Sequence, residues 1–142
     1  STSEWCAGAL FDALQCAEVP LLVDIGEAGW EAIAGILAAH PRLPVIVLET
    51  FYRIDRQVYP LMERYPGLHL EANTYGAFKG VEGIVERFGA ERLIFGTAMP
   101  AYEPGGPMSL VAYADVSDED RAAMAGGNLL RLLGQPWGES DE

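Results

Sequence analysis

The chain has 142 residues, 21 of them acidic and 9 basic, so its formal net charge is −12 at pH 7. This excess of negative charge repels nucleic-acid phosphates and anionic lipid surfaces, and we expect neither nucleic acid nor a membrane as a partner. Half of the residues are hydrophobic and 21% are charged, which is typical of a folded globular protein and excludes a disordered chain. No apolar run approaches the ~20 residues of a membrane-spanning helix, and we expect a cytoplasmic protein.

The first predicted element is an amphipathic helix over residues 4–17, which Ser3 can cap. In such a helix Cys6 and Cys16 lie ~15 Å apart at 1.5 Å per residue, too far for a disulfide between them. Neither cysteine has metal-ligand spacing. We therefore expect both to be buried as small hydrophobic side chains.

Four short apolar runs are predicted to be β-strands. They occupy residues 20–25, 44–50, 68–74 and 92–99. The runs are nearly continuous, without regular alternation of apolar and polar residues, and this favours strands that are covered on both faces in a parallel sheet. Successive strands start about 24 residues apart, which leaves room for a helix in each gap.

Helical patterns fill these gaps. Apolar residues spaced for one helix face lie within 30–37 and again within 81–88, where Gly89 provides a stop. In the second gap Pro60 is expected to begin a short helix, because proline fits poorly inside one.

The end of the chain follows a different pattern. A turn-rich loop, AYEPGGP (101–107), follows the last strand, and a helix capped by Ser117 is expected to close at Gly134. We expect one domain over residues 1–134 and a flexible acidic tail over 135–142.

The order of elements predicts an α/β fold. About four parallel strands alternate with helices after an N-terminal helix, which is half of a (βα)8 barrel in element count. On pattern alone, a small open doubly wound sheet of four strands is the alternative. No glycine-rich dinucleotide or phosphate-binding motif follows any strand, so nothing indicates a nucleotide.

Two segments near the end of the chain resemble the amidohydrolase-2 group of metal-dependent hydrolases and decarboxylases. FGAERLIFGTAMP (88–100) resembles the last barrel strand of that group, which ends in FGTD-x-P, and VSDEDRAAMAGGNLLRLLG (116–134) resembles the helix ending in a GGN-x-x-RLLG-like run. Upstream, VPLLVDIGE (19–27) and HPRLPVIVLE (40–49) resemble the fifth and sixth strands. The resemblance implies the C-terminal half of a barrel.

The resemblance also implies where metal-binding and catalytic groups would lie, and there the sequence departs from the family. The fifth-strand His position is Asp24, the sixth-strand His position is Glu49, and the eighth-strand Asp, a ligand or general base, is Ala98. If Asp24 and Glu49 converge, their oxygens suit a hard divalent cation such as Mg²⁺ or Mn²⁺, although two carboxylates do not normally suffice alone. Otherwise both are solvated residues at strand ends. We expect no cofactor unless this metal site is retained.

Four further polar residues are candidates for hydrogen bonds to a ligand. Glu71 and Asn73 end the third predicted strand, Tyr75 lies in the loop after it, and Thr97 lies in the turn beside Ala98. With Asp24 and Glu49 they make up the predicted ligand-binding set.

Three other polar residues are interpreted as structural. His40 ends a helix, where histidine interacts favourably with the dipole. His69 is expected to point toward the helix layer, and Asn128 is expected to bind nearby backbone.

Half a barrel leaves its inner wall uncovered. The inward residues, taken to be Leu22, Val45, Val47 and Ile94, would face no opposite wall, and two strand edges would stay unpaired. A homodimer, a complementary half-barrel chain or N-terminal half, or the chain's own terminal helices could cover them.

These observations leave three hypotheses. The first is an amidohydrolase-related domain that has lost autonomous metal-dependent hydrolysis and acts in assembly or small-ligand binding. The second is a metal-dependent hydrolase or decarboxylase completed by another chain or a missing N-terminal half. The third is a plain βαβ interaction module whose acidic surface meets a basic partner.

Overall fold

The computed structural model describes residues 4–134. Four strands form one parallel sheet in the order β1-β2-β3-β4. Their bounds are β1 Leu21–Asp24, β2 Val45–Leu48, β3 Leu68–Glu71 and β4 Leu93–Ile94. The predicted parallel sheet with intervening helices is confirmed. Because the strand order never reverses, the doubly wound alternative is wrong.

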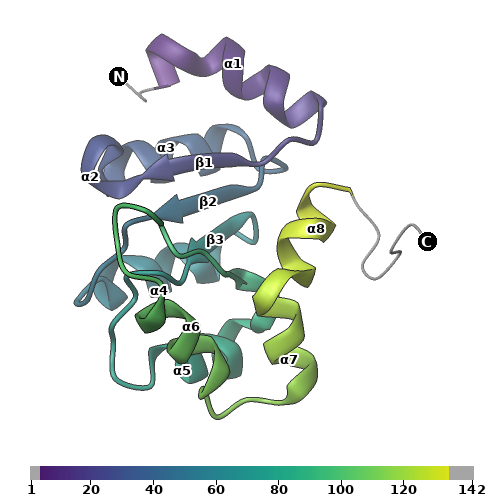
Figure 1. Ribbon diagram of the computed structural model, residues 1–142. Coiled ribbons are helices and arrows are strands. Elements are labelled where there is room, and N and C mark those ends of the chain that lie inside the picture. Colours follow the sequence, from purple (N-terminus) through teal and green to yellow (C-terminus); the bar gives the residue numbers. More distant parts are fainter. Residues whose placement is uncertain (1–3, 135–142) are drawn as a thin grey trace.

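Helices follow each strand and cover one face of the sheet, with α3 and α4 behind the strands in Figure 1. They are α1 Glu4–Cys16, α2 Ile25–Ala28, α3 Trp30–Ala39, α4 Asp55–Arg64, α5 Gly80–Phe88, α6 Gly105–Ala112, α7 Asp118–Ala122 and α8 Asn128–Leu132. A 3₁₀ turn, η1 (Ala90–Arg92), precedes β4, and a π-helical turn, η2 (Ala123–Gly127), joins α7 to α8. None of the helices within 4–134 has the length and apolar character needed to cross a bilayer.

The main core lies between the sheet and this helix layer. Alternate strand residues point into it and are almost fully buried; they are Val23, Val45, Val47, Leu68, Leu70 and Leu93. From the helices, Ile33, Ile36, Val58, Met62 and Ile84 meet them. Each such side chain stabilises the fold by about 1.5–3 kcal/mol when fully buried, so this layer supplies most of the driving force for folding.

The opposite face of the sheet carries the other residues of each strand. Leu22 and Ile94 lie there, as predicted. The residues of β2 on this face are Ile46 and Leu48. The prediction that Val45 and Val47 point inward is wrong. Because β2 is apolar at every position, its sequence does not show which alternate set faces the helices.

Helix α1 packs on α3 beside the first strand. Phe11 is buried, and its ring meets the ring of His40 edge-on with centroids 5.6 Å apart. His40 Nδ1 lies 3.2 Å from the carboxylate of Asp12, so this histidine anchors α1, in agreement with a structural role. The prediction that Cys6 and Cys16 are buried is wrong, because both lie on the exposed part of α1.

Helix α4 differs from its predicted extent. It begins at Asp55, and Pro60 lies inside it. The backbone angle of proline suits a helix, and the hydrogen bond that it removes would reach the exposed first turn, where water can solvate the freed carbonyl. The expected start at Pro60 is therefore wrong.

Helix α6 was expected to be part of a loop. It begins at Gly105, directly after Pro104, and buries Pro107 and Val111 against the core. Two glycines and two prolines at its start made the sequence typical of a loop. Proline is nevertheless well tolerated in the first turn of a helix, where its missing N–H has no helical partner.

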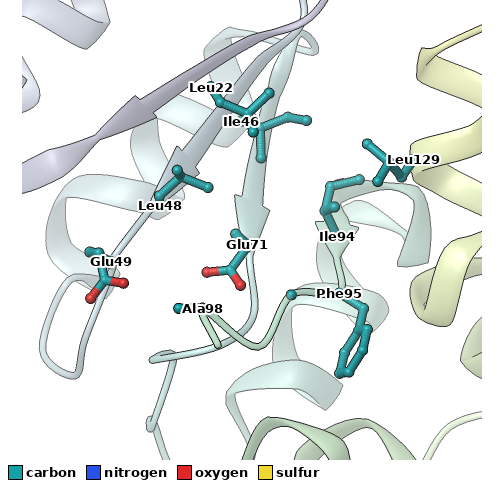
Figure 2. Close-up of a pocket in the computed structure, with 10 residues that line it drawn as sticks. Leu22, Ile46, Leu48, Glu49, Glu71, Ile94, Phe95, Ala98 and Leu129 are labelled. Carbon is teal, nitrogen blue, oxygen red and sulfur yellow. The ribbon is translucent and has the colours of Figure 1, made fainter. Parts of the chain in front are cut away.

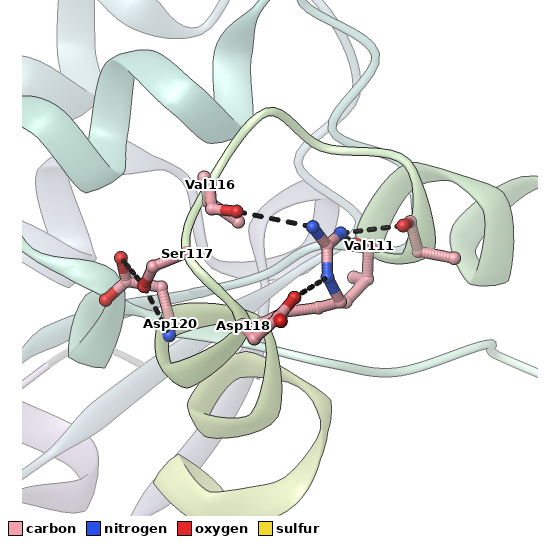
Figure 3. A network of polar contacts seen from close by, with 7 residues as sticks. Val111, Val116, Ser117, Asp118 and Asp120 are labelled. Atoms are coloured by element: carbon pink, nitrogen blue, oxygen red, sulfur yellow. Dashed lines mark hydrogen bonds and ion pairs between the residues drawn. The ribbon is translucent and has the colours of Figure 1, made fainter.

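The last helical segment starts as predicted. The Ser117 hydroxyl accepts a hydrogen bond from the Asp120 amide at 3.0 Å. Figure 3 shows the next contact, in which the Arg121 guanidinium donates to the carbonyls of Val111 (2.8 Å) and Val116 (3.3 Å). These bonds cap the end of α6 and tie it to α7. The predicted single helix is interrupted by η2 and ends before Gly134, which has a φ of 69°.

Asn128 binds backbone, as predicted. Its buried Nδ2 donates to the carbonyls of Ala90 (2.8 Å) and Leu93 (2.9 Å), which joins α8 to the start of β4.

His69 does not point toward the helix layer. It is paired with Ile46 and alternates with core residues Leu68 and Leu70, so that prediction is wrong. Its Nδ1 lies 3.0 Å from the carbonyl oxygen of Glu91. Burial lowers the pKa of His69 to about 4, against a smaller opposing effect of that hydrogen bond. A neutral structural histidine follows.

Two predictions lie outside the described residues. They are the Ser3 cap of the first helix and the flexible tail over 135–142. The domain boundary at residue 134 stays a prediction.

Candidate functional site

A pocket of about 260 Å³ opens on the inner face of the sheet, toward the carboxyl ends of the strands. Most of its lining is apolar, and Figure 2 shows the side chains that form it. The lining residues are Leu22, Ile46, Leu48, Glu49, Glu71, Ile94, Phe95, Gly96, Ala98 and Leu129. This end of a barrel sheet is where TIM-barrel enzymes place their active sites.

Asp24, at the end of β1, is used by the local backbone. Its Oδ1 accepts a hydrogen bond of 2.6 Å from the amide of Gly26 and caps the short helix α2. Its carboxylate is thus partly committed to a structural role, close to the mouth of the pocket.

Glu49, at the end of β2, lines the pocket and faces a tyrosine from the loop after β4. The charge of Glu49, aided by a hydrogen bond from the phenol and by the charge of Asp24, raises the pKa of Tyr102. Three separate loops therefore meet at the mouth. Glu49 holds a left-handed backbone angle (φ 56°), which is uncommon for a residue with a side chain.

Glu71, at the end of β3, is the buried carboxyl group of the site. It is 7% exposed, and Figure 2 shows its carboxyl group beside Ala98. Burial raises the pKa of Glu71 from 4.5 to about 7; the charge of Glu49 adds to this effect, and a hydrogen bond from the Asn73 backbone opposes it. Glu71 therefore exchanges a proton near neutral pH, as acid–base groups do.

Two small residues of the strand-end turn make room for this carboxyl group. A side chain at Gly96 would overlap the Glu71 carboxyl group and would have to displace this flexible group from its place. Ala98 has a φ of 49°, a left-handed conformation that Asp and Asn adopt more readily than Ala. The backbone at position 98 therefore suits an aspartate better than the alanine that it carries.

The remaining predicted residues lie outside the pocket lining. Tyr75 is buried in the core, and its hydroxyl donates to Asp55 at 2.8 Å. The Thr97 hydroxyl accepts a hydrogen bond of 3.4 Å from the Met99 amide, within the turn, and its binding of a ligand stays a prediction. The side-chain nitrogen of Asn73 is buried and finds no hydrogen-bond partner within the described chain.

Six members of the site are not predicted by the sequence: Ile46, Leu48, Phe95, Gly96 and Leu129 in the lining, and Tyr102 at the mouth. Tyr102 comes from a loop whose return toward β2 leaves no pattern in the sequence, and Leu129 reaches the pocket only because α8 leans over the sheet. Gly96 carried a signal, since a glycine at a strand end indicates a close approach by another group.

The side chains at the mouth do not fit a divalent metal by themselves. Within the described residues, no three His, Cys, Asp or Glu side chains are grouped so that they could hold an ion. Asp24 caps a helix, Glu49 faces Tyr102, and Ala98 offers only a methyl group. A metal site here would need ligands from elsewhere.

Solved structures share this architecture. Bb4693, an uncharacterised TIM-barrel protein of Bordetella bronchiseptica, has a TM-score of 0.78 at 20% identity, over 95% of this chain and 52% of that protein. A 2,6-dihydroxybenzoate decarboxylase complexed with 2,6-dihydroxybenzoate has a TM-score of 0.61 at 16% identity, over 87% and 53%. A dihydroxybenzoic acid decarboxylase of Polaromonas sp. JS666, solved with manganese and the inhibitor 2-nitroresorcinol, has 0.61 at 15%, over 87% and 52%. At these identities the similarity shows the fold, about half of a TIM barrel.

The sequence adds the family. The Amidohydrolase family model matches residues 9–135, nearly the whole chain, and the chain therefore belongs to that family. A comparison with curated proteins finds no match. The chain spans about half the length of the solved structures that it matches.

Proposed function

We propose that this chain is an amidohydrolase half-barrel that binds a small ligand at the pocket and does not carry out metal-dependent hydrolysis on its own. The observation that carries the proposal is the methyl group of Ala98 at the position that the family resemblance assigns to a ligating or proton-accepting aspartate. A methyl group can neither hold a metal nor take a proton from water. The pocket itself is present, with a volume of about 260 Å³ and a mostly apolar lining.

The other carboxyl groups do not replace the aspartate. Asp24 is engaged in its helix cap, and burial raises the pKa of Glu71 to about 7, so that a proton competes with a cation for this carboxyl group. These groups can instead accept hydrogen bonds from a ligand, as the sequence analysis predicted for them.

The same proposal includes an assembly. Leu22 is 55% exposed on the inner face, and β1 is an edge strand of the described sheet, whereas the other edge strand, β4, bonds η2 and α8 through the Phe95 amide and the Leu93 carbonyl. An exposed apolar side chain and a free strand edge at β1 favour association. A homodimer, or a complementary half-barrel chain, would cover both features.

A second candidate function is a metal-dependent hydrolase or decarboxylase completed by another chain or by an N-terminal half. The left-handed backbone at Ala98, which suits an aspartate, and the pocket at the catalytic end of the strands support this alternative. In that case the other half would supply the missing ligands.

Native mass spectrometry combined with metal analysis tests these proposals on the purified 142-residue chain. We expect a dimer, or a complex with a second chain, without stoichiometric metal. A chain that retains one metal per protomer would overturn the loss of autonomous metal chemistry and support the second candidate. A metal-free monomer at micromolar concentration would contradict the assembly.

A restored carboxylate sharpens the test. Ala98→Asp places an oxygen ligand beside Glu49 and Glu71, and we expect it to bind Mn²⁺ at least tenfold more tightly than the unchanged chain. Ala122→Asp, on the exposed part of α7, adds the same charge away from the pocket and serves as the control. Equal Mn²⁺ affinity of the two variants would show that the mouth does not retain the geometry of a metal site.

A further inference from the structure

The pocket combines an apolar lining with polar side chains of only one kind. Glu49 and Glu71 are the polar side chains among its lining residues, and no Lys, Arg, amide or hydroxyl side chain of the described chain lines it. Figure 2 shows both carboxyl groups beside Ala98, below the apolar residues of the strands. A ligand would therefore meet an apolar surface and two hydrogen-bond acceptors.

No cationic side chain of the described residues lines the pocket beside the Glu71 carboxyl group. Its side chain is more than nine-tenths buried and points into the pocket, where the Asn73 backbone is its hydrogen-bond donor. A buried carboxylate is costly unless a cation or several donors compensate its charge. Glu49 lies close enough to make that cost larger.

The other charged group at the mouth has the same sign. Asp24 approaches from β1, and Tyr102 from the loop after β4 brings a neutral phenol. An anionic ligand would be repelled by this arrangement, whereas a cationic group would be attracted by all three carboxyl groups.

We propose that the pocket takes a small ligand with an apolar body and an ammonium head, and that the head lies between the carboxyl groups of Glu49 and Glu71. The proposal rests on the ligand-binding function proposed above and adds the chemical class of the ligand. The apolar body covers the strand side chains and the head supplies the missing donors.

The pH dependence of binding follows from the same contacts. A cation beside Glu71 lowers the pKa of this carboxyl group, so binding releases the proton that Glu71 holds near neutral pH. Affinity for an ammonium ligand therefore rises roughly tenfold between pH 6 and pH 8.

Benzylamine is the probe, with benzyl alcohol and benzoate as neutral and anionic matches of the same ring. Each is titrated into the ¹⁵N-labelled 142-residue chain, and amide shifts are followed by NMR. We expect benzylamine to shift the amides of Glu71, Gly96 and Ala98, with weaker binding of benzyl alcohol and weakest binding of benzoate.

Two variants test whether the carboxyl groups of Glu71 and Glu49 bind the ammonium group. Glu71→Gln and Glu49→Gln are each expected to weaken benzylamine binding roughly tenfold to hundredfold and to leave benzyl alcohol nearly unchanged. Glu86→Gln, an exposed carboxylate on α5, removes the same charge from another surface and is expected to bind like the unchanged chain.

The outcomes separate the two proposals. If none of the three probes shifts the pocket amides, the ligand-binding function itself fails. If benzoate or benzyl alcohol binds at least as well as benzylamine, ligand binding stands and the ammonium preference is wrong. Unchanged benzylamine affinity in Glu71→Gln, or affinity that does not rise from pH 6 to pH 8, would also overturn the preference.

Discussion

The two faces of the sheet differ in how completely their side chains are buried. On the helix side Val47, Leu70 and their neighbours are fully buried between strands and helices. On the inner side the cover is uneven: Leu22 on β1 is 55% exposed, whereas Ile46 and Ile94, which line the pocket with Leu129 of α8, are buried. The same four strands thus carry one face that is packed against helices and one that is exposed at β1 and borders a pocket toward β4.

This difference separates folding from function. Parallel sheets are normally covered on both faces, and this sheet is fully covered on one. Loss of a helix-side contact should therefore affect the fold, whereas loss of the exposed Leu22 on the inner face should affect what the half-barrel binds or completes.

A matched pair of leucines tests the comparison most strongly. Leu70→Ala removes a fully buried side chain from the helix-side core and should lower the free energy of unfolding by about 2–5 kcal/mol. Leu22→Ala, on the exposed inner face, should lower it by less than about 1 kcal/mol. Urea denaturation of both variants measures the difference. Equal losses would mean that the inner face is already packed, by a second copy for example.

A pair of asparagines extends the comparison to the two ends of the sheet. Asn128→Ala leaves the buried carbonyls of Ala90 and Leu93 without their donor, which should cost about 2–4 kcal/mol. Asn73→Ala, at the pocket end, removes a side-chain nitrogen without a partner in the described chain and should cost less than about 1 kcal/mol. Thermal and urea unfolding of the two variants provide the measurement. A larger cost for Asn73→Ala would show that the pocket end contributes to stability after all.

The helix side of the sheet could be predicted largely from the sequence. The stop at Gly89 and the cap at Ser117 are local signals, and both are confirmed. The four strands lie within the predicted runs but are shorter, and β4 covers only Leu93–Ile94 of the run 92–99. The alternation of β2 was wrong because four consecutive apolar residues give no contrast between faces. The predicted start of α4 at Pro60 is wrong because the helix begins at Asp55 and buries Val58, a tertiary contact that the proline signal does not reveal.

The inner face of the sheet and its pocket could be predicted only in part. Asp24, Glu49 and Glu71 lie at strand ends, and a parallel sheet brings such ends together, so their convergence followed from topology. The burial of Glu71 did not, because it depends on the space left by Gly96 and on the charge of Glu49. The approach of Tyr102 depends on a loop fold that no local pattern encodes.

The smallest expected effect concerns the titration of Glu71. Because the pKa of Glu71 is raised from 4.5 to about 7 in the folded chain, the folded state holds the proton more tightly than the unfolded state. Its contribution to stability is full below pH 4.5 and is lost as the pH rises through 7. Glu71→Gln, which mimics the protonated form at every pH, should therefore become more stable than the unchanged chain by on the order of 2 kcal/mol from pH 5 to pH 8.

Comparing the two chains at each pH isolates this group. His69, whose pKa is lowered to about 4, reduces stability as the pH falls below 6.5, but it does so in both chains and cancels in the difference. Glu86→Gln, exposed on α5, should show a difference that does not change between pH 5 and pH 8. If Glu71→Gln behaves like Glu86→Gln, Glu71 is as well solvated in the folded chain as in the unfolded one. The inner face would then be open to water at its carboxyl end, and the contrast with the helix side would be larger than the structure shows.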